Sequence, residues 1–175
     1  MKFLLLILLL LFLFSCQKEN SSEDANKIGG NITANSDFAN SVSEKQIVKK
    51  LTPKCGRNTF TILIANKYGS EHIIFAEGNT IRRTVKMPDQ SDAANFSLDR
   101  FGETKNGFEI AVEYGSKYYY RKSFNFVCEK DDFYFDKVGV EKFEKNSPGK
   151  ITKKDIKMSP KEPIERFSFT GFLID

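Results

Sequence analysis

Hydrophobic and polar residues alternate along much of the chain after residue 55, and this period of two predicts β-strands. The clearest stretch is residues 107–140, which contains three such segments separated by short polar turns. In the first segment, one face carries the hydrophobic side chains Phe108, Ile110, Val112 and Tyr114. Turns at Gly115-Ser116 and at residues 129–132 join it to segments 118–128 and 133–140. Three consecutive strands joined by short turns predict an antiparallel meander.

Five further segments with strand-like patterning complete a mainly β prediction of about seven to eight strands. They are residues 60–64, 72–77, 80–87, 95–101 and 166–174. Residues 144–163 are polar, lysine-rich and interrupted by three prolines, so we expect a long loop there. A short strand or turn over residues 151–158 is left open. The antiparallel meander is expected to form either a curled sheet or a small barrel.

The chain before these strands divides into a tether and one short N-terminal helix. Residues 17–43 contain few large hydrophobic side chains, so they cannot bury enough surface to offset the entropy of ordering them. We expect a flexible tether over residues 16–43 and a single β-rich domain over residues 44–175. In that domain Ile47, Val48 and Leu51 recur with helical spacing, which predicts a helix over residues 44–51 that ends before Pro53.

The first sixteen residues have the pattern of an export signal. Lys2 precedes a run of twelve apolar residues, 3–14. A membrane-spanning helix needs about 20 apolar residues, so this run matches a signal peptide over residues 1–15. The sequence Leu13-Phe14-Ser15-Cys16 resembles the lipobox of bacterial lipoproteins. The resemblance implies cleavage after Ser15 and attachment of diacylglycerol to the Cys16 thiol, with further acylation, which anchors the chain stably in a membrane.

Two more features are similar to those of bacterial lipoproteins. Gln17, rather than aspartate, follows Cys16, and in that family this favours the outer membrane. The meander resembles a β-rich module of uncharacterised lipoproteins, which implies no known activity. The residues that carry this second resemblance are Asn106-Gly107, Gly115-Ser116, the tyrosines at 118–120, and Asp132-Phe133-Tyr134-Phe135.

Composition and charge exclude several classes of function. Without residues 1–15 the chain has 26 Lys and Arg against 23 Asp and Glu, and this net charge of +3 is too small to indicate nucleic acid as a partner. A single histidine, His72, and three cysteines cannot form a multi-histidine metal site or a cysteine-rich zinc module. Glu109 and Glu113 share a strand face about 13 Å apart, which is too far for a glycosidase pair. We therefore expect no enzyme, no cofactor and no metal.

Cys55 and Cys128 are the two cysteines left once Cys16 carries lipid. Export places their thiols in a compartment where disulfides form and persist, so we predict a bridge between Cys55 and Cys128. The alternative is a buried Cys128 that acts as a small hydrophobic residue and an unreacted Cys55.

Two surface features are candidates for binding. Aromatic side chains lie on both faces of segment 118–122, so Tyr119 and Arg121 are exposed if Tyr118 and Tyr120 pack inward. An exposed tyrosine beside a cation would stack on a sugar or anchor a protein. Residues 142–161 carry seven lysines and a net charge of +5, so Lys153 and Lys154 would contact lipopolysaccharide phosphates or an acidic partner. The alternative for segment 118–122 is that its aromatic residues only fill the core. The alternative for residues 142–161 is a solvated loop whose lysines protect a sheet edge from unwanted pairing.

These patterns predict a non-catalytic, membrane-anchored lipoprotein whose β-domain binds a protein or a glycan. One specific version is an immunity-type lipoprotein that captures a toxin. The second interpretation is a lipocalin-like carrier of a small apolar ligand, although the chain has no tryptophan for that family's Gly-x-Trp motif. An envelope enzyme is the third.

Overall fold

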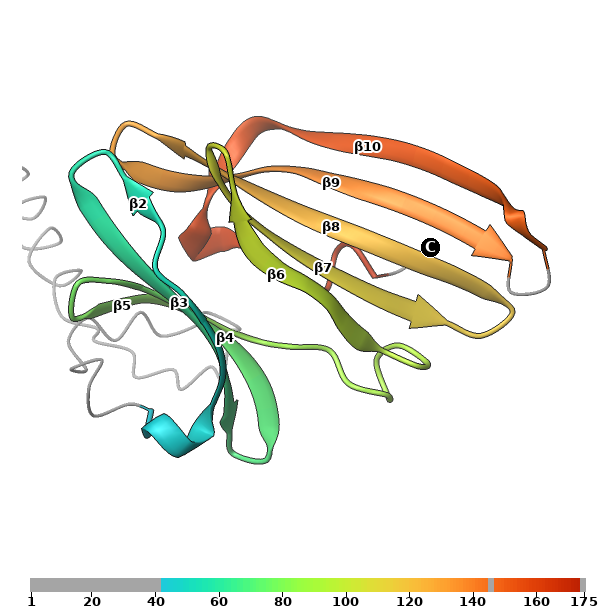
Figure 1. Cartoon of the computed structure of the whole chain (residues 1–175), viewed down its shortest axis with the longest axis horizontal. Coiled ribbons are helices and arrows are strands. Elements are labelled where there is room, and N and C mark those ends of the chain that lie inside the picture. The colour runs from blue at the N-terminus through green and yellow to red at the C-terminus, as the bar shows by residue number, and fades with distance from the viewer. Residues whose placement is uncertain (1–41, 145–146, 174–175) are drawn as a thin grey trace, which may run out of the picture. The chain divides into compact units, whose positions relative to one another are not determined.

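The first sheet is built from the N-terminal half of the domain. The structure is a computed structural model that describes residues 42–144 and 147–173, without the side chains of residues 147–149. The strands are β1 (Ile47–Leu51), β2 (Lys54–Cys55), β3 (Asn58–Lys67), β4 (Ser70–Glu77) and β5 (Thr80–Lys86). They pair antiparallel in the order β1-β3-β4-β5, and the short β2 also pairs with β3 (Figure 1).

The second sheet contains the segment whose pattern was clearest in the sequence. Its strands are β6 (Ser97–Thr104), β7 (Gly107–Gly115), β8 (Tyr118–Glu129), β9 (Asp132–Glu144) and β10 (Ser147–Pro163). They pair antiparallel in sequence order. The mainly β, antiparallel meander prediction is confirmed, with ten strands among the described residues instead of seven or eight. The described strands form two open sheets, which is the curled-sheet alternative and not a closed barrel.

Side chains from both sheets meet in one core that is dominated by phenylalanine. Phe75 of β4 lies with its ring centre 6.2 Å from that of Phe108 and 5.8 Å from that of Phe126, on β7 and β8. Near the start of β9, Phe133 meets the ring of Phe60 on β3 edge to face at 4.9 Å. Aromatic pairs at such distances add about 0.5–1.5 kcal/mol each beyond the burial of their area. These rings therefore hold the two sheets together.

The C-terminal segment fills the core without joining a sheet. A 3₁₀ turn, η2 (Ile164–Arg166), follows β10, and the described residues after it, 167–173, contain a turn and no strand. The predicted strand over 166–174 is therefore wrong. Phe167 and Phe169 are nevertheless both buried in the core. The alternation of hydrophobic and polar residues in this segment arises because two phenylalanine rings insert between the sheets. The backbone of the segment pairs with no described strand.

The predicted helix over residues 44–51 is wrong beyond its first turn. Only η1 (Glu44–Gln46) is helical, as a 3₁₀ turn, and Ile47–Leu51 pairs with β3 as β1. A two-turn helix gains little stability by itself, whereas the free side of β3 offers backbone partners to a segment that contains β-branched Ile47 and Val48.

The predicted loop over residues 144–163 is also wrong, because this segment is β10 and pairs along β9. Its lysines and prolines are compatible with a strand at the edge of a sheet, where one side of the backbone needs no partner. The pairing is interrupted between Lys157 and Glu162, around Pro160. Backbone pairing with β9 thus decides the conformation of a segment that buries few side chains.

One ion-pair cluster links elements from both sheets. The guanidinium of Arg82 on β5 contacts the carboxylates of Glu77 on β4, Asp132 on β9 and Glu165 on η2. Arg82 Nε donates to Glu165 Oε1 at 2.6 Å, and Nη2 donates to Asp132 Oδ2 at 2.9 Å. Burial alone would lower the pKa of Arg82, but the hydrogen bonds and charges of Asp132 and Glu165 outweigh it and raise that pKa. The cation therefore stays charged where the two sheets and η2 meet.

Candidate binding surface

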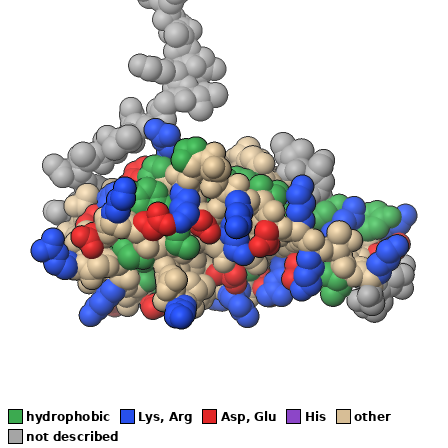
Figure 2. Space-filling model, turned by 90° about the horizontal axis from the view of Figure 1, so that it is seen from above, with side chains coloured by type: hydrophobic (Ala, Val, Ile, Leu, Met, Phe, Trp, Pro, Cys, Tyr) green, Lys and Arg blue, Asp and Glu red, His purple; other side chains and the backbone are tan. Residues whose placement is uncertain are grey.

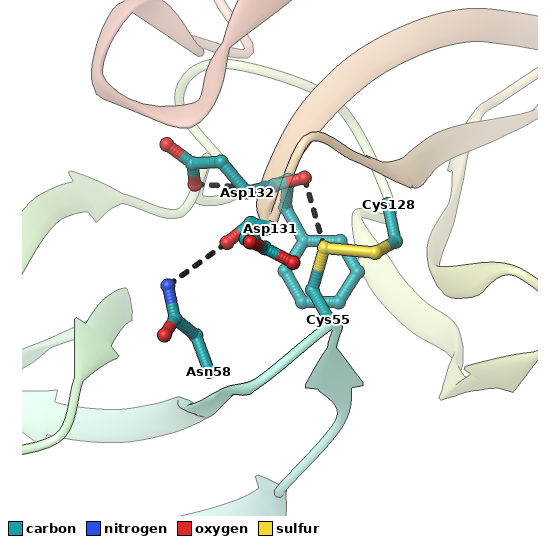
Figure 3. Close-up of a disulfide and its surroundings, with 6 residues drawn as sticks. Cys55, Asn58, Cys128, Asp131 and Asp132 are labelled. Atoms are coloured by element: carbon teal, nitrogen blue, oxygen red, sulfur yellow. Dashed lines mark hydrogen bonds between the residues drawn. A yellow bond between two sulfur atoms is a disulfide. The ribbon is translucent and has the colours of Figure 1, made fainter.

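The predicted disulfide is present and joins the two sheets (Figure 3). Cys55 ends β2 and Cys128 lies near the end of β8, with 5.4 Å between their Cα atoms. The turn after β2 lies against the β8–β9 turn, where Asn58 Nδ2 donates to the carbonyl oxygen of Asp131 at 3.0 Å. Gly56 has φ +57°, and a Cβ atom there would lie 1.6 Å from Asp131 Oδ1. The close approach of the two turns at the bridge therefore requires glycine at position 56.

Alternation on β8 places Tyr118 and Tyr120 on one face and Tyr119 and Arg121 on the other, but the exposure of these residues differs from the expectation. Tyr119 and Arg121 point away from the core on β8, yet both are half-buried. The ring of Tyr119 stacks on Phe143 of β9 at 5.6 Å, and Arg121 forms an ion pair with Asp99 on β6. Neighbouring side chains of the same sheet thus cover much of both residues, and their role in binding stays a prediction.

The exposed tyrosine of this strand is Tyr118, which is 40 % exposed although it shares the face of the buried residues. Figure 1 shows the reason, because the ends of β8, β9 and β10 extend past the strands of the first sheet. Lys142 Nζ lies 4.5 Å from the ring centre of Tyr118 and 5.3 Å from that of Tyr120. Lys117 Nζ lies 5.5 Å from the Tyr118 ring. Two cations therefore surround one exposed aromatic ring.

A buried lysine supports this end of the sheet from the side of the core. Lys122 is 5 % exposed, and its Nζ lies 5.4 Å from the ring centre of Tyr114 and 5.8 Å from that of Tyr120. The same ammonium group donates to the carbonyl oxygen of Phe172 in the C-terminal segment. The rings of Tyr114 and Tyr120 stack at 5.5 Å. These contacts fix the position of Tyr120, and Tyr120 in turn supports the exposed end of β8 that carries Tyr118.

A small pocket of about 190 Å³ opens beside Tyr118 and extends to the edge strand. It is lined by Tyr118, Lys142, Phe143, Glu144, Lys150 and Thr152, and we call these residues together with Tyr120 the Tyr118 surface. Three of the lining residues are uncharged, two are lysines and one is acidic. The arrangement presents an aromatic ring and a cation side by side, which suits a carbohydrate or a protein side chain with an anionic group.

Both lysines predicted to bind lie on β10 and are exposed. Lys153 Nζ donates to Glu141 Oε1 of β9 at 2.6 Å, whereas Lys154 has no ion-pair partner among the described residues. Figure 2, which views the molecule from the side of β10, shows lysine and arginine side chains repeated along this face, with acidic and hydrophobic side chains between them. The structure thus brings Lys154 to the same strand as Lys150 of the Tyr118 surface.

The remaining candidates for chemistry are dispersed. His72 is half-buried on β4, with Nδ1 3.1 Å from the carbonyl oxygen of Ser70. Glu109 on β7 accepts from Arg100 at 3.4 Å. No group of three or more His, Cys, Asp or Glu side chains within residues 42–144 and 147–173 is placed to hold a metal ion.

A larger cleft of about 750 Å³ lies beside the disulfide and opens to solvent. Polar side chains dominate its lining, among them Lys54, Glu103, Lys105 and Asn106. Such a lining does not suit the small apolar ligand of a lipocalin-like carrier.

Comparison of the chain with protein-family models, curated proteins and solved structures found no match. In the part of the chain that the structure describes, no helix is both long and apolar enough to cross a membrane. The lipobox and residues 16–41 of the expected tether lie outside the described residues. The assignment of function therefore depends on the side chains themselves.

Proposed function

We propose that this protein is a non-catalytic lipoprotein, anchored in the outer membrane through lipid on Cys16, whose β-domain binds a protein or a glycan. The sequence Leu13-Phe14-Ser15-Cys16 supports the anchor, because a lipobox directs diacylglycerol to its cysteine. The binding role rests on the Tyr118 surface. An immunity-type lipoprotein that captures a toxin is one specific version of this function.

The observation that carries the proposal is the exposed ring of Tyr118 with the ammonium groups of Lys142 and Lys117 close to it. An aromatic side chain that only filled the core would be covered, as Phe124 and Phe126 are on the same face of β8. Tyrosine combines a large apolar area with a hydroxyl group and loses little conformational entropy on binding, so it is frequent in binding surfaces. The neighbouring lysines add attraction for an anionic group of the ligand.

We expect that a photo-reactive p-benzoylphenylalanine at position 118 will cross-link the ligand in living cells, because this side chain lies at the centre of the proposed surface. Position 68 is the matched control. Tyr68 is 90 % exposed and also has a lysine, Lys67, 5.3 Å from its ring centre, but it lies in the β3–β4 turn. The adduct at position 118 should fall about tenfold when Lys142 is replaced by glutamate.

Electrophoresis and mass spectrometry of the adduct distinguish a protein partner, which gives a discrete band, from a polysaccharide, which gives a ladder. Melting temperatures of the labelled proteins check that both variants are folded. Equal cross-linking at positions 118 and 68, or an adduct at 118 that is unchanged by Lys142→Glu, would contradict the proposed surface.

The anchor has its own test. Radiolabelled palmitate is expected to enter the wild-type protein but not the Cys16→Ser variant, because serine has no thiol to accept diacylglycerol. The precursor of Cys16→Ser should also keep its signal peptide, which a gel of whole cells detects. Incorporation of label at the wild-type level into Cys16→Ser would rule out the lipobox.

A further inference from the structure

Strand β10 forms a long free edge of the second sheet. It has one neighbour, β9, among the described strands. The pairs from Ile151↔Phe143 to Lys157↔Lys137 follow one another without interruption over seven residues. The opposite edge, β6, has a shift in its pairing between Leu98 and Arg100. The outer side of β10 therefore offers an uninterrupted row of backbone groups to which another strand can pair.

The side chains along this edge carry an excess of positive charge. Lys150, Lys154 and Lys157 are exposed and have no ion-pair partner among the described residues. The acid of the stretch, Asp155, accepts from Lys137 Nζ at 2.7 Å, and this hydrogen bond raises the pKa of Lys137. The negative charge of Asp155 is thus neutralised by β9, and Lys150, Lys154 and Lys157 are left to face solvent.

Hydrophobic side chains interrupt the lysines on the same edge. Ile151 is 50 % exposed and Ile156 is 38 % exposed. Lysines on an edge strand by themselves are explained by protection against unwanted strand pairing. Exposed isoleucines have the opposite effect, because they favour pairing with another strand. The combination matches an edge that is selective for one kind of partner.

We propose that β10 binds an extended, acidic segment of a partner protein, which adds to the second sheet as a sixth strand. Backbone hydrogen bonds hold the segment, its acidic side chains lie against Lys154 and Lys157, and its apolar side chains lie against Ile151 and Ile156. This inference deepens the proposed function by naming the partner class. The edge is continuous with the Tyr118 surface, because Lys150 and Thr152 of β10 line the pocket beside Tyr118.

A synthetic peptide can be matched to this edge residue by residue. The sequence EVTETTV, with two flanking threonines at each end, runs antiparallel to β10. It places glutamate opposite Lys157 and Lys154, and valine opposite Ile156 and Ile151. Fluorescence anisotropy with the full-length chain measures its Kd, and hydrogen–deuterium exchange should show new protection of those backbone amides in residues 151–157 that point away from β9.

Backbone methylation separates strand addition from attraction between charges alone. In an antiparallel pair, every second residue of the peptide directs its N–H group to the protein. N-methylation of one alternate set should therefore abolish binding, and methylation of the other set should leave most of it. If both methylated peptides bind like the parent, strand addition is overturned.

The charge of the edge is tested by Lys154→Glu/Lys157→Glu, which should weaken binding at least about tenfold, because two attractive contacts become repulsive. The matched control is Lys105→Glu/Lys130→Glu, the same change in charge at exposed hairpin positions. A peptide with glutamine in place of glutamate should bind weakly to all three proteins.

Four results would overturn the proposal. The first is that the two double variants bind EVTETTV equally well, and the second is that the wild-type protein binds the glutamine peptide as tightly as EVTETTV. The third is that EVTETTV shows no saturable binding. The fourth is that self-association already protects the amides of residues 151–157 when no peptide is present. If the peptide does not bind β10 but the cross-link at position 118 still forms, only this inference is overturned. If the peptide binds but the cross-link at position 118 does not form, only the proposal for the Tyr118 surface is overturned.

Discussion

Replacing Phe167 with alanine is expected to lower the free energy of unfolding by about 3–5 kcal/mol, the usual cost of removing a buried phenylalanine ring. Phe167 is fully buried and belongs to a segment that pairs with no strand. Its ring centre lies 4.9 Å from that of Phe126 and 5.2 Å from that of Phe135 in the second sheet, and 6.1 Å from that of Phe75 in the first. Alanine would leave a cavity where these three rings meet.

Urea unfolding followed by circular dichroism measures the effect of Phe167→Ala. The matched control is Phe143→Ala, which removes the same ring from a half-buried position where it stacks on Tyr119. We expect the control to cost markedly less, because water already reaches part of that ring. If the two variants lost equal stability, or if Phe167→Ala cost less than about 1 kcal/mol, the position of Phe167 between the sheets would be contradicted.

The meander could be predicted from the sequence because each of its strands buries one face. In β7 the residues expected on one face, Phe108, Ile110, Val112 and Tyr114, are all buried, and the small Ala111 on the other face is buried as well. The turns after β7 and β8 lie at the Gly115-Ser116 and 129–132 positions that the sequence indicated. Where one face is buried and the turns are short, the burial pattern and the turn residues predict the same strands and the same register. Contacts with distant parts of the chain then change the prediction little.

The three local errors share a physical cause. In each case the conformation depends on contact with another part of the fold, and the local sequence pattern does not reveal that contact. The three segments are residues 44–51, 144–163 and 166–174. β1 and β10 exist because β3 and β9 have a free side, and a free side has no signature in the paired segment itself. For residues 167–173 that contact is with the core: the phenylalanines enter it, while the backbone pairs with no described strand.

The candidate surface could be predicted only in part. Alternation correctly divides Tyr118 and Tyr120 from Tyr119 and Arg121, since successive side chains of a strand point to opposite faces. Alternation does not tell where the facing sheet ends. Tyr118 is exposed because β8 extends beyond the end of the facing sheet. Lys142, which lies 24 positions later in the chain, approaches the Tyr118 ring from β9. A cation–aromatic pair of this kind depends on strand register, which the sequence pattern alone leaves open.

Removing the disulfide is expected to cost roughly 4 kcal/mol, because the bridge closes a loop of 73 residues in the unfolded chain. That loss is a large fraction of the stability of a typical domain. The bridge also joins β2 of the first sheet to β8 of the second, so its loss releases a direct link between the sheets. The change is Cys55→Ala/Cys128→Ala, and equilibrium urea unfolding measures the free energy difference.

Reduction of the wild-type protein is the matched control for packing. Cys55 is fully buried, so the alanine variant also loses contacts made by its sulfur atom, whereas the reduced protein keeps every sulfur in place. We expect reduction with dithiothreitol to reproduce most of the loss, because the main effect of the bridge is on the unfolded chain. Equal stability of the reduced and oxidised proteins would contradict this prediction. Two alkylatable thiols, at Cys55 and Cys128, in protein isolated from the cell envelope would show instead that the bridge does not form there.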